Sequence, residues 1–120
     1  MNICWITIYV RDMEESLKFY TQILGLQLKR SFSAGGGTEI CFLDGNGTDL
    51  ELIFDPNRKE VSCAADVSVG FRVASLDKTI ADLKEKGITE ITGPIAPNPS
   101  IRFIFITDPN GLKIQLAEQN

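Results

Sequence analysis

The stretch DGNGTDLEL, residues 44–52, has a second copy 64 positions later, DPNGLKIQL, residues 108–116. Asp, Asn, Gly and the final Leu recur in the same register, whereas Glu51 of the first copy becomes Gln115 in the second. A repeat inside a short chain indicates one structural unit used twice, so the residues around the two copies should also repeat.

The residues around the first copy have the pattern of one strand, one helix and three further strands. Residues 3–10, ICWITIYV, are rich in the residue types that favour a pleated strand. Asp12 is predicted to cap a helix that stops at Gly25, with Glu15 completing a capping box. Three strands are then expected near residues 26–33, 38–44 and 48–54.

The second half repeats this order. A strand is predicted over residues 67–73, followed by a helix capped by Ser75 and ended by Gly87. Strands are then expected near residues 88–92, 101–107 and 112–117. The segment ITGPIAPNPS, residues 91–100, contains three prolines and is predicted to be a rigid connection between strands or a pocket rim.

The length of 120 residues fits one compact domain. Within it we predict module one over residues 1–54, a linker over 55–66 and module two over 67–120. Each module has the order β-α-β-β-β, so the fold class is α+β.

Composition excludes several classes of function. Twelve basic against sixteen acidic residues give a net charge of −4 without a basic cluster, which disfavours nucleic acid as a partner. The sequence has no apolar run long enough to span a membrane and no secretory leader is expected. The three cysteines form no CxxC pair, which favours reduced thiols and a cytoplasmic location; Cys4 and Cys41 are both expected to be buried. The sequence has no histidine, so Ser-His and Cys-His nucleophile pairs are excluded.

Three segments together carry a resemblance to a known family. They are YVRDMEESLKFYTQILGLQL, FRVASLDKTIADLKEKGI and FIFITDPNGLKIQLAE, at residues 9–28, 71–88 and 103–118. The chain resembles the glyoxalase/bleomycin-resistance/extradiol-dioxygenase group, also called the vicinal oxygen chelate superfamily. The resemblance implies two βαβββ modules that form a curved mixed sheet around one cavity, and dimers are common in this family.

The resemblance also implies four ligand positions in those members that use a metal ion. A His or Gln lies in the first strand of each module and a Glu lies in the last strand. In this sequence the four positions become Trp5, Glu51, Ser68 and Gln115. Only Glu51 is a good ligand for a divalent cation, and an indole N–H can only donate a hydrogen bond. We therefore expect no metal site and no metal cofactor.

Strand alternation selects further candidates for the cavity wall. Trp5 either stacks on a planar guest or fills the position that a metal would take. Glu51 either contacts a ligand, with a base role as a weaker option, or is a surface residue. Arg72 either holds a carboxylate or phosphate of a ligand or pairs with Glu51. Tyr9 faces either the cavity or another subunit, and alternation does not settle the face of Arg102. The predicted ligand-binding residues are Trp5, Tyr9, Glu51, Ser68, Arg72, Arg102 and Gln115.

The resulting functional hypothesis is a metal-free protein that binds a small planar or aromatic molecule, for sequestration or resistance, as a homodimer. The alternative is a lyase or isomerase of the glyoxalase I (lactoylglutathione lyase) type, with a divalent metal held by Glu51 and Gln115. A third alternative is a regulatory subunit with a filled pocket. Extradiol dioxygenase activity is disfavoured because it requires iron or manganese. Whether the protein is an enzyme is left open at this point.

Overall fold

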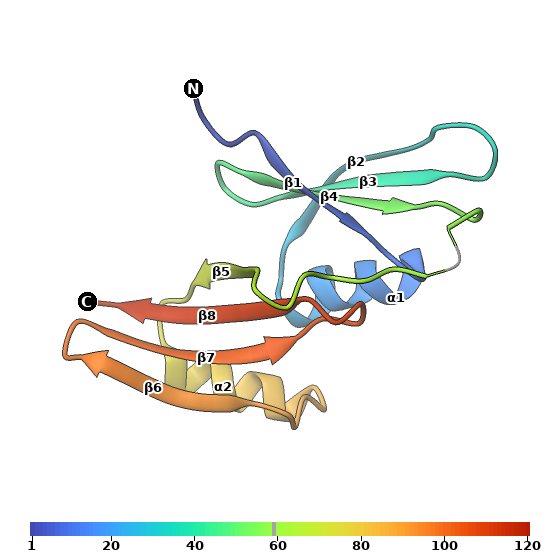
Figure 1. The fold of residues 1–120 in the computed structure, drawn as a ribbon. Helices are drawn as coiled ribbons and strands as arrows, with labels where there is room; N and C mark the ends of the chain where they lie inside the picture. Colours follow the sequence, from blue (N-terminus) through green and yellow to red (C-terminus); the bar gives the residue numbers. More distant parts are fainter. Residues whose placement is uncertain (59) are drawn as a thin grey trace. The chain divides into compact units, whose positions relative to one another are not determined.

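The computed structural model describes residues 1–58 and 60–120. The chain divides into two compact units, Met1–Ser62 and Cys63–Asn120, each with one four-stranded sheet (Figure 1). Residue 59, in the predicted linker, lies outside the described residues.

Unit one follows the predicted order of elements. These are β1 (Trp5–Tyr9), α1 (Met13–Lys18), a π-helical turn η1 (Phe19–Ile23), β2 (Gln27–Ser33), β3 (Glu39–Asp44) and β4 (Asp49–Phe54). The strand order in its sheet is β1-β4-β3-β2, with β1 parallel to β4 and the other pairs antiparallel.

Unit two repeats the same order. Its elements are β5 (Ser68–Arg72), α2 (Leu76–Glu85), β6 (Thr92–Asn98), β7 (Ile101–Thr107) and β8 (Lys113–Gln119). The strand order β5-β8-β7-β6 matches that of unit one, again with a parallel first and last strand. The predicted α+β class and the βαβββ repeat are therefore confirmed.

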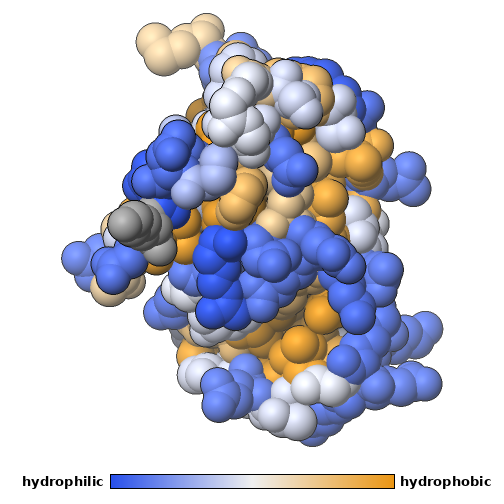
Figure 2. Space-filling model, turned by 90° about the vertical axis from the view of Figure 1, so that its right-hand side faces the viewer, coloured by the Kyte–Doolittle hydropathy of each residue, from blue (hydrophilic) through white to orange (hydrophobic). Residues whose placement is uncertain are grey.

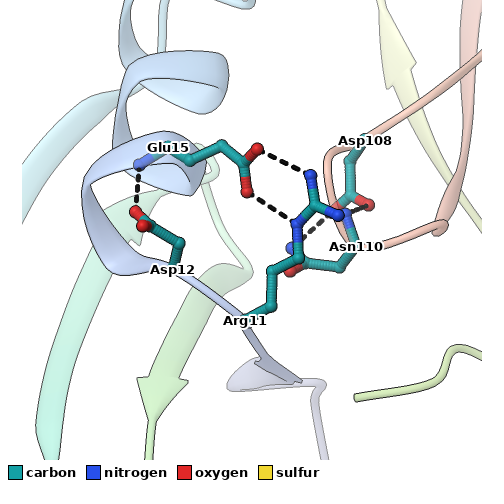
Figure 3. A network of polar contacts seen from close by, with 5 residues as sticks. All are labelled: Arg11, Asp12, Glu15, Asp108 and Asn110. Carbon is teal, nitrogen blue, oxygen red and sulfur yellow. Dashed lines mark hydrogen bonds and ion pairs between the residues drawn. The ribbon is translucent and has the colours of Figure 1, made fainter. Parts of the chain in front are cut away.

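The N terminus of α1 forms as the sequence predicts. Asp12 is extended, and its Oδ1 accepts a hydrogen bond of 2.8 Å from the backbone N–H of Glu15 (Figure 3). The side-chain carboxylate of Glu15 accepts two hydrogen bonds from the Arg11 guanidinium, at 2.7 and 2.9 Å. This pairing lowers the pKa of Glu15, because the hydrogen bonds from Arg11 favour the charged carboxylate. The chain leaves the helical region at Gly25, whose φ of +79° suits glycine.

The helix of unit one widens into a π-helical turn at η1, which sequence periodicity did not predict. Leu24 donates to the carbonyl of Phe19, five residues back, at 3.0 Å. The extra residue per turn brings two adjacent aromatic side chains, Phe19 and Tyr20, into the core, with edge-to-face rings 5.1 Å apart.

Each sheet has one buried face, and the helix-facing positions predicted from alternation supply much of it. In unit one these are Ile8, Val10, Leu50 and Leu52, all at most 5% exposed. Cys4 does not follow the pattern, because β1 begins only at Trp5 and Cys4 precedes the sheet. The prediction that Cys4 is buried is therefore wrong, whereas Cys41 is buried as expected.

The proline-rich segment of unit two is a strand and not a connection. The strand expected near residues 88–92 begins only at Thr92, and β6 runs on to Asn98 through Pro94 and Pro97. Its position explains why proline is tolerated, since β6 is an edge strand that pairs only with β7. The pairing is irregular on both sides of Ile95, which is where missing N–H donors disturb the ladder.

The two copies of the repeated turn differ in how deeply their aspartates are buried. Asp108 is 4% exposed, and its Oδ1 accepts from the backbone N–H groups of Asn110 and Leu112, both at 2.8 Å. The Asn110 side chain adds a third hydrogen bond, at 3.3 Å (Figure 3). Asp44 of the first copy is exposed, and its Oδ1 accepts from Asn46 N at 2.8 Å. Asp108 therefore fixes its turn through more contacts than Asp44 does.

We predict that Asp108→Ala lowers the free energy of unfolding by roughly 2–3 kcal/mol, because it leaves buried backbone donors without an acceptor. The matched change Asp44→Ala should cost about 1 kcal/mol or less, since water can replace an exposed carboxylate. Urea unfolding followed by circular dichroism measures both, and equal losses for the two variants would contradict the prediction.

Candidate functional site

The strand register of unit one brings four chemically distinct side chains into one row across the sheet. Thr7 lies opposite Glu51, Glu51 opposite Phe42, and Phe42 opposite Arg30. Because neighbours in register point to the same side of a sheet, this row lies on the face opposite the buried Leu50 and Leu52. We call this surface the aromatic face and define it by Trp5, Thr7, Arg30, Phe32, Phe42 and Glu51.

Three aromatic rings form the apolar part of the aromatic face, and one guanidinium lies against the central ring. Phe42 is buried at its centre, with the Trp5 ring edge-to-face at 5.7 Å and the Phe32 ring nearly parallel at 6.4 Å. The Arg30 guanidinium carbon lies 4.0 Å from the Phe42 ring centroid, within cation–π distance. Phe42 is thus the ring around which the other three side chains gather.

Two of these rings remain open to solvent. Trp5 is 51% exposed and Phe32 is 48% exposed. Figure 2 shows that hydrophobic residues reach the surface between hydrophilic ones on the face that it draws. Single exposed apolar residues are common, but aromatic rings grouped around one buried ring form a surface suited to a flat apolar guest.

A polar group borders the rings. The Thr7 hydroxyl donates a hydrogen bond of 2.6 Å to Oε1 of Glu51, which fixes the carboxylate on the sheet and leaves further acceptor capacity. Trp5 lies opposite Asp49, two residues before Glu51, so indole and carboxylate are diagonal neighbours on adjacent strands. Asp49 is itself paired with Lys29 at 3.0 Å, and the hydrogen bond from Lys29 lowers the pKa of Asp49.

The corresponding face of unit two is more polar and carries cations. Gly70 lies opposite Gln115 and Ser68 opposite Lys113. A side chain at Gly70 would lie 3.7 Å from Oε1 of Gln115, so glycine leaves the amide without the neighbour that Thr7 provides for Glu51. The Lys113 ammonium lies 4.1 Å from the Phe105 ring centroid on the same face.

Three predicted site residues take part in other contacts. Arg102 lies opposite Glu118 on the side that faces α2, and it pairs with Asp77 of α2 at 3.2 Å. Tyr9 shares the side of Trp5, and the Arg58 guanidinium carbon lies 4.0 Å from its ring centroid. Arg72, at the end of β5, donates a hydrogen bond to the side chain of Gln119. The structure thus separates Arg102 from the face that carries Gln115.

The residues at the four family ligand positions do not fit a divalent metal. In unit one, Glu51 has an indole and a hydroxyl as neighbours, and its Oε1 already accepts from Thr7. In unit two, Ser68 and Gln115 offer only neutral oxygens beside the ammonium of Lys113. Among the described residues, no group of three or more His, Cys, Asp or Glu side chains could hold a metal ion. A catalytic site needs about three strong ligands, so this donor set falls short.

Strand alternation in the sequence places Thr7 on the side of Trp5, but sequence reasoning did not select Arg30, Phe32 or Phe42. A β-bulge between Leu28 and Arg30 shifts the register of β2, so simple alternation along that strand misplaces half of its side chains. Phe42 lies in an apolar strand, so its sequence context indicates a core residue, and its side chain is in fact buried. The sequence did offer one signal for this surface: Arg30, a cation, is followed two positions later by the aromatic Phe32.

A βαβββ order that occurs twice in one chain is typical of one class of protein. The Glyoxalase/Bleomycin resistance protein/Dioxygenase superfamily matches residues 2–116, and the chain belongs to this family.

Individual relatives support the family assignment. The uncharacterized protein YwkD of Bacillus subtilis is 35% identical over 98% of this chain and 97% of its own length. A probable lactoylglutathione lyase of Arabidopsis thaliana is 29% identical over 92% of this chain, which corresponds to 33% of that protein. Among solved structures, the antibiotic binding protein TnmS3 of Streptomyces sp. CB03234 superposes with a TM-score of 0.78 at 22% identity, covering 100% of this chain and 97% of that chain. At that identity the likeness shows the fold.

Among the described residues, none of the helices combines the length and apolar character needed to cross a bilayer.

We predict a pH-dependent effect of removing Lys29. Because the pKa of Asp49 is lowered in the folded protein, its pairing stabilises the fold above the unfolded pKa of about 4 and is lost as pH falls through the lowered value. Lys29→Met should therefore have a lower Tm than the unmodified protein at pH 7, and the two Tm values should converge near about pH 2. Lys29→Arg keeps the positive charge and should not lower Tm at pH 7. A Tm difference that persists unchanged at about pH 2 would contradict this assignment.

Proposed function

We propose that this protein binds a small planar aromatic molecule on the aromatic face of unit one, without a metal ion, as a sequestration or resistance protein. The observation that carries the proposal is the pair of half-exposed rings, Trp5 and Phe32, held on one side of the sheet by the buried Phe42. The antibiotic-binding function of TnmS3, whose fold this chain shares, supports the same reading.

The physical advantage of such a guest is the burial of ring surface. Covering apolar area contributes roughly 25 cal/mol per Å², and an aromatic contact adds about 0.5–1.5 kcal/mol beyond area burial. Since Arg30 and Trp5 are positioned by contacts with Phe42, little side-chain ordering remains to be done when the guest binds. A flat molecule therefore gains more here than a saturated one of equal size.

The polar groups at the border of the rings define the second part of the ligand. Glu51 is held by Thr7 and can accept a hydrogen bond from a hydroxyl or an amino group of the guest. Arg30 can in turn meet an oxygen on the other side of Phe42. The proposed ligand is thus a fused or linked aromatic system that carries at least one hydrogen-bond donor. Ser68, Arg72 and Gln115 of unit two remain further proposed contacts.

We predict that Trp5→Ala weakens the binding of a planar polycyclic aromatic compound at least about tenfold, because it removes both ring area and the stacking contact. Trp5→Phe should retain most of the affinity. Trp5 is the single tryptophan of the chain, so quenching of its fluorescence reports binding directly, and calorimetry measures the variants.

A matched control is Leu28→Ala, which removes another apolar side chain that is 47% exposed. Leu28 lies opposite the buried Leu43 and so does not belong to the aromatic face. This change should leave affinity unaltered. Equal binding of the saturated analogue of the same compound, or an unchanged affinity in Trp5→Ala, would contradict the proposal.

A second candidate function is lactoylglutathione lyase chemistry. It is favoured by the carboxylate that Glu51 retains at a family ligand position and by the lyase relative of Arabidopsis thaliana. Proton abstraction next to a carbonyl produces an enediolate whose charge needs stabilisation where it develops. Glu51 could take the proton, but the aromatic face offers only Arg30 as a cation, and that group covers Phe42.

We predict that protein purified without chelators carries no stoichiometric Ni, Zn, Mn or Fe, and that adding Ni²⁺ or Zn²⁺ produces no turnover of the hemithioacetal of methylglyoxal and glutathione. Elemental analysis and the absorbance of the thioester product test both points. A stoichiometric metal together with turnover would favour the lyase over the binding protein.

A further inference from the structure

Unit one has a hollow between α1 and the strands β2 and β3, and its lining includes Phe32 of the aromatic face. It is a groove of about 550 Å³, lined by residues of α1, β2 and β3. Met13, Leu17 and Cys41 contribute an apolar floor, and the carboxylates of Glu14 and Glu39 contribute its charge. Its volume lies within the range of small-molecule sites, about 300–1,000 Å³.

The internal repeat supplies a direct comparison for the two carboxylates. At a spacing of 63 positions, Glu14 of α1 corresponds to Asp77 of α2, and Glu39 of β3 corresponds to Arg102 of β7. The strand register agrees, because Glu39 lies opposite Phe54 and Arg102 lies opposite Glu118 at the equivalent place of the last strand.

In unit two this place is closed by an ion pair. Arg102 reaches Asp77 at 3.2 Å and so connects the first turn of α2 to the sheet. In unit one the position of the arginine is taken by a second acid. An acid–base pair in one module therefore corresponds to an acid–acid pair in the other, at the same place in the same fold.

Among residues 1–58 and 60–120, no Lys or Arg forms an ion pair with Glu14 or Glu39. Both carboxylates line the groove, so a cation placed in the groove is attracted to both.

The floor of the groove gives an independent indication of a ligand. Cys41 is 5% exposed, lines the groove, and makes no hydrogen bond through its thiol within the described part of the chain. In unit two the equivalent residue is Ile104, which is fully buried. Burial and the negative charge of Glu39 raise the pKa of the Cys41 thiol, so it is a neutral, soft contact surface for an apolar group.

From these observations we propose that the groove between α1, β2 and β3 binds an organic cation with an apolar body, whose charged group takes the place that Arg102 occupies in unit two. Glu14 and Glu39 hold the cationic head, while Met13, Leu17 and Cys41 contact the apolar part. The groove shares Phe32 with the aromatic face, but Trp5, Arg30 and Phe42 do not line it, and the proposal does not depend on the function proposed for that face.

Benzamidinium is a suitable probe, because it combines a flat cation, which pairs with a carboxylate in a bidentate way, with an apolar ring. Benzamide has the same shape without the charge. We expect benzamidinium to produce saturable amide shifts in α1 and β3 in ¹⁵N–¹H NMR spectra recorded at constant ionic strength. Benzamide should bind at least about tenfold more weakly, since it lacks the charge-assisted hydrogen bonds.

Glu39→Arg converts unit one to the arrangement of unit two. We expect this variant to lose benzamidinium binding and to keep or raise its Tm, because the new guanidinium can pair with Glu14. Glu14→Gln should weaken binding about tenfold. Glu60→Arg makes the same change of charge outside the groove, in the segment after β4, and should bind as the unmodified protein does.

The outcome also separates this site from the aromatic face. Benzamidinium affinity should be unchanged in Trp5→Ala, whichever way the test of the aromatic face turns out. The proposal is overturned if benzamidinium does not bind, if benzamide binds equally well, if the shifts lie in β1 and not in α1, or if a folded Glu39→Arg variant retains the affinity.

Discussion

The parallel pairing of the first strand with the last strand in each module is the constraint on which the rest of the structure depends. It aligns Ile8 with Leu52 and Phe71 with Leu116 on the buried side. The same register then places Thr7 beside Glu51, and Gly70 beside Gln115, on the opposite side. Since side chains alternate along a strand, one choice of core side chains fixes both faces at once. The candidate site is therefore a consequence of the register that the core selects.

On this common framework the two modules have diverged at a few polar positions. Glu51 is held by the Thr7 hydroxyl, whereas Gln115 lies beside a glycine and near a lysine. On the helix side, the Asp77–Arg102 ion pair of unit two is replaced in unit one by two carboxylates around a groove. Neither exchange touches the core, so both could accumulate at little cost in stability. The repeated fold thus carries an aromatic face and an acidic groove in unit one, and a cationic face in unit two.

Much of the fold could be predicted because its signals are local. Asp12 and Ser75 cap their helices with hydrogen bonds to residues three positions on, which sequence patterns report directly. The signals failed where a neighbouring element decided the outcome. Pro94 and Pro97 belong to a strand only because β6 lies at an edge of its sheet, and Cys4 is exposed because the strand begins one residue later. The expectation that the two modules share one cavity stays a prediction, as do the homodimer and the cytoplasmic location.

The sequence by itself determined the repeat, the family and the type of residue at each family ligand position, because periodicity, capping and turn chemistry act within a few residues. The resemblance also predicts that Trp5 and Ser68 stand where metal-using members have His or Gln. Only the tertiary structure decided that Phe42 gathers Trp5, Phe32 and Arg30 around itself, since a bulge in β2 sets which of its residues face that side. It also decided that Arg102 faces a helix and pairs with Asp77. Contacts between strands and helices distant in sequence depend on register and packing, which no local pattern specifies.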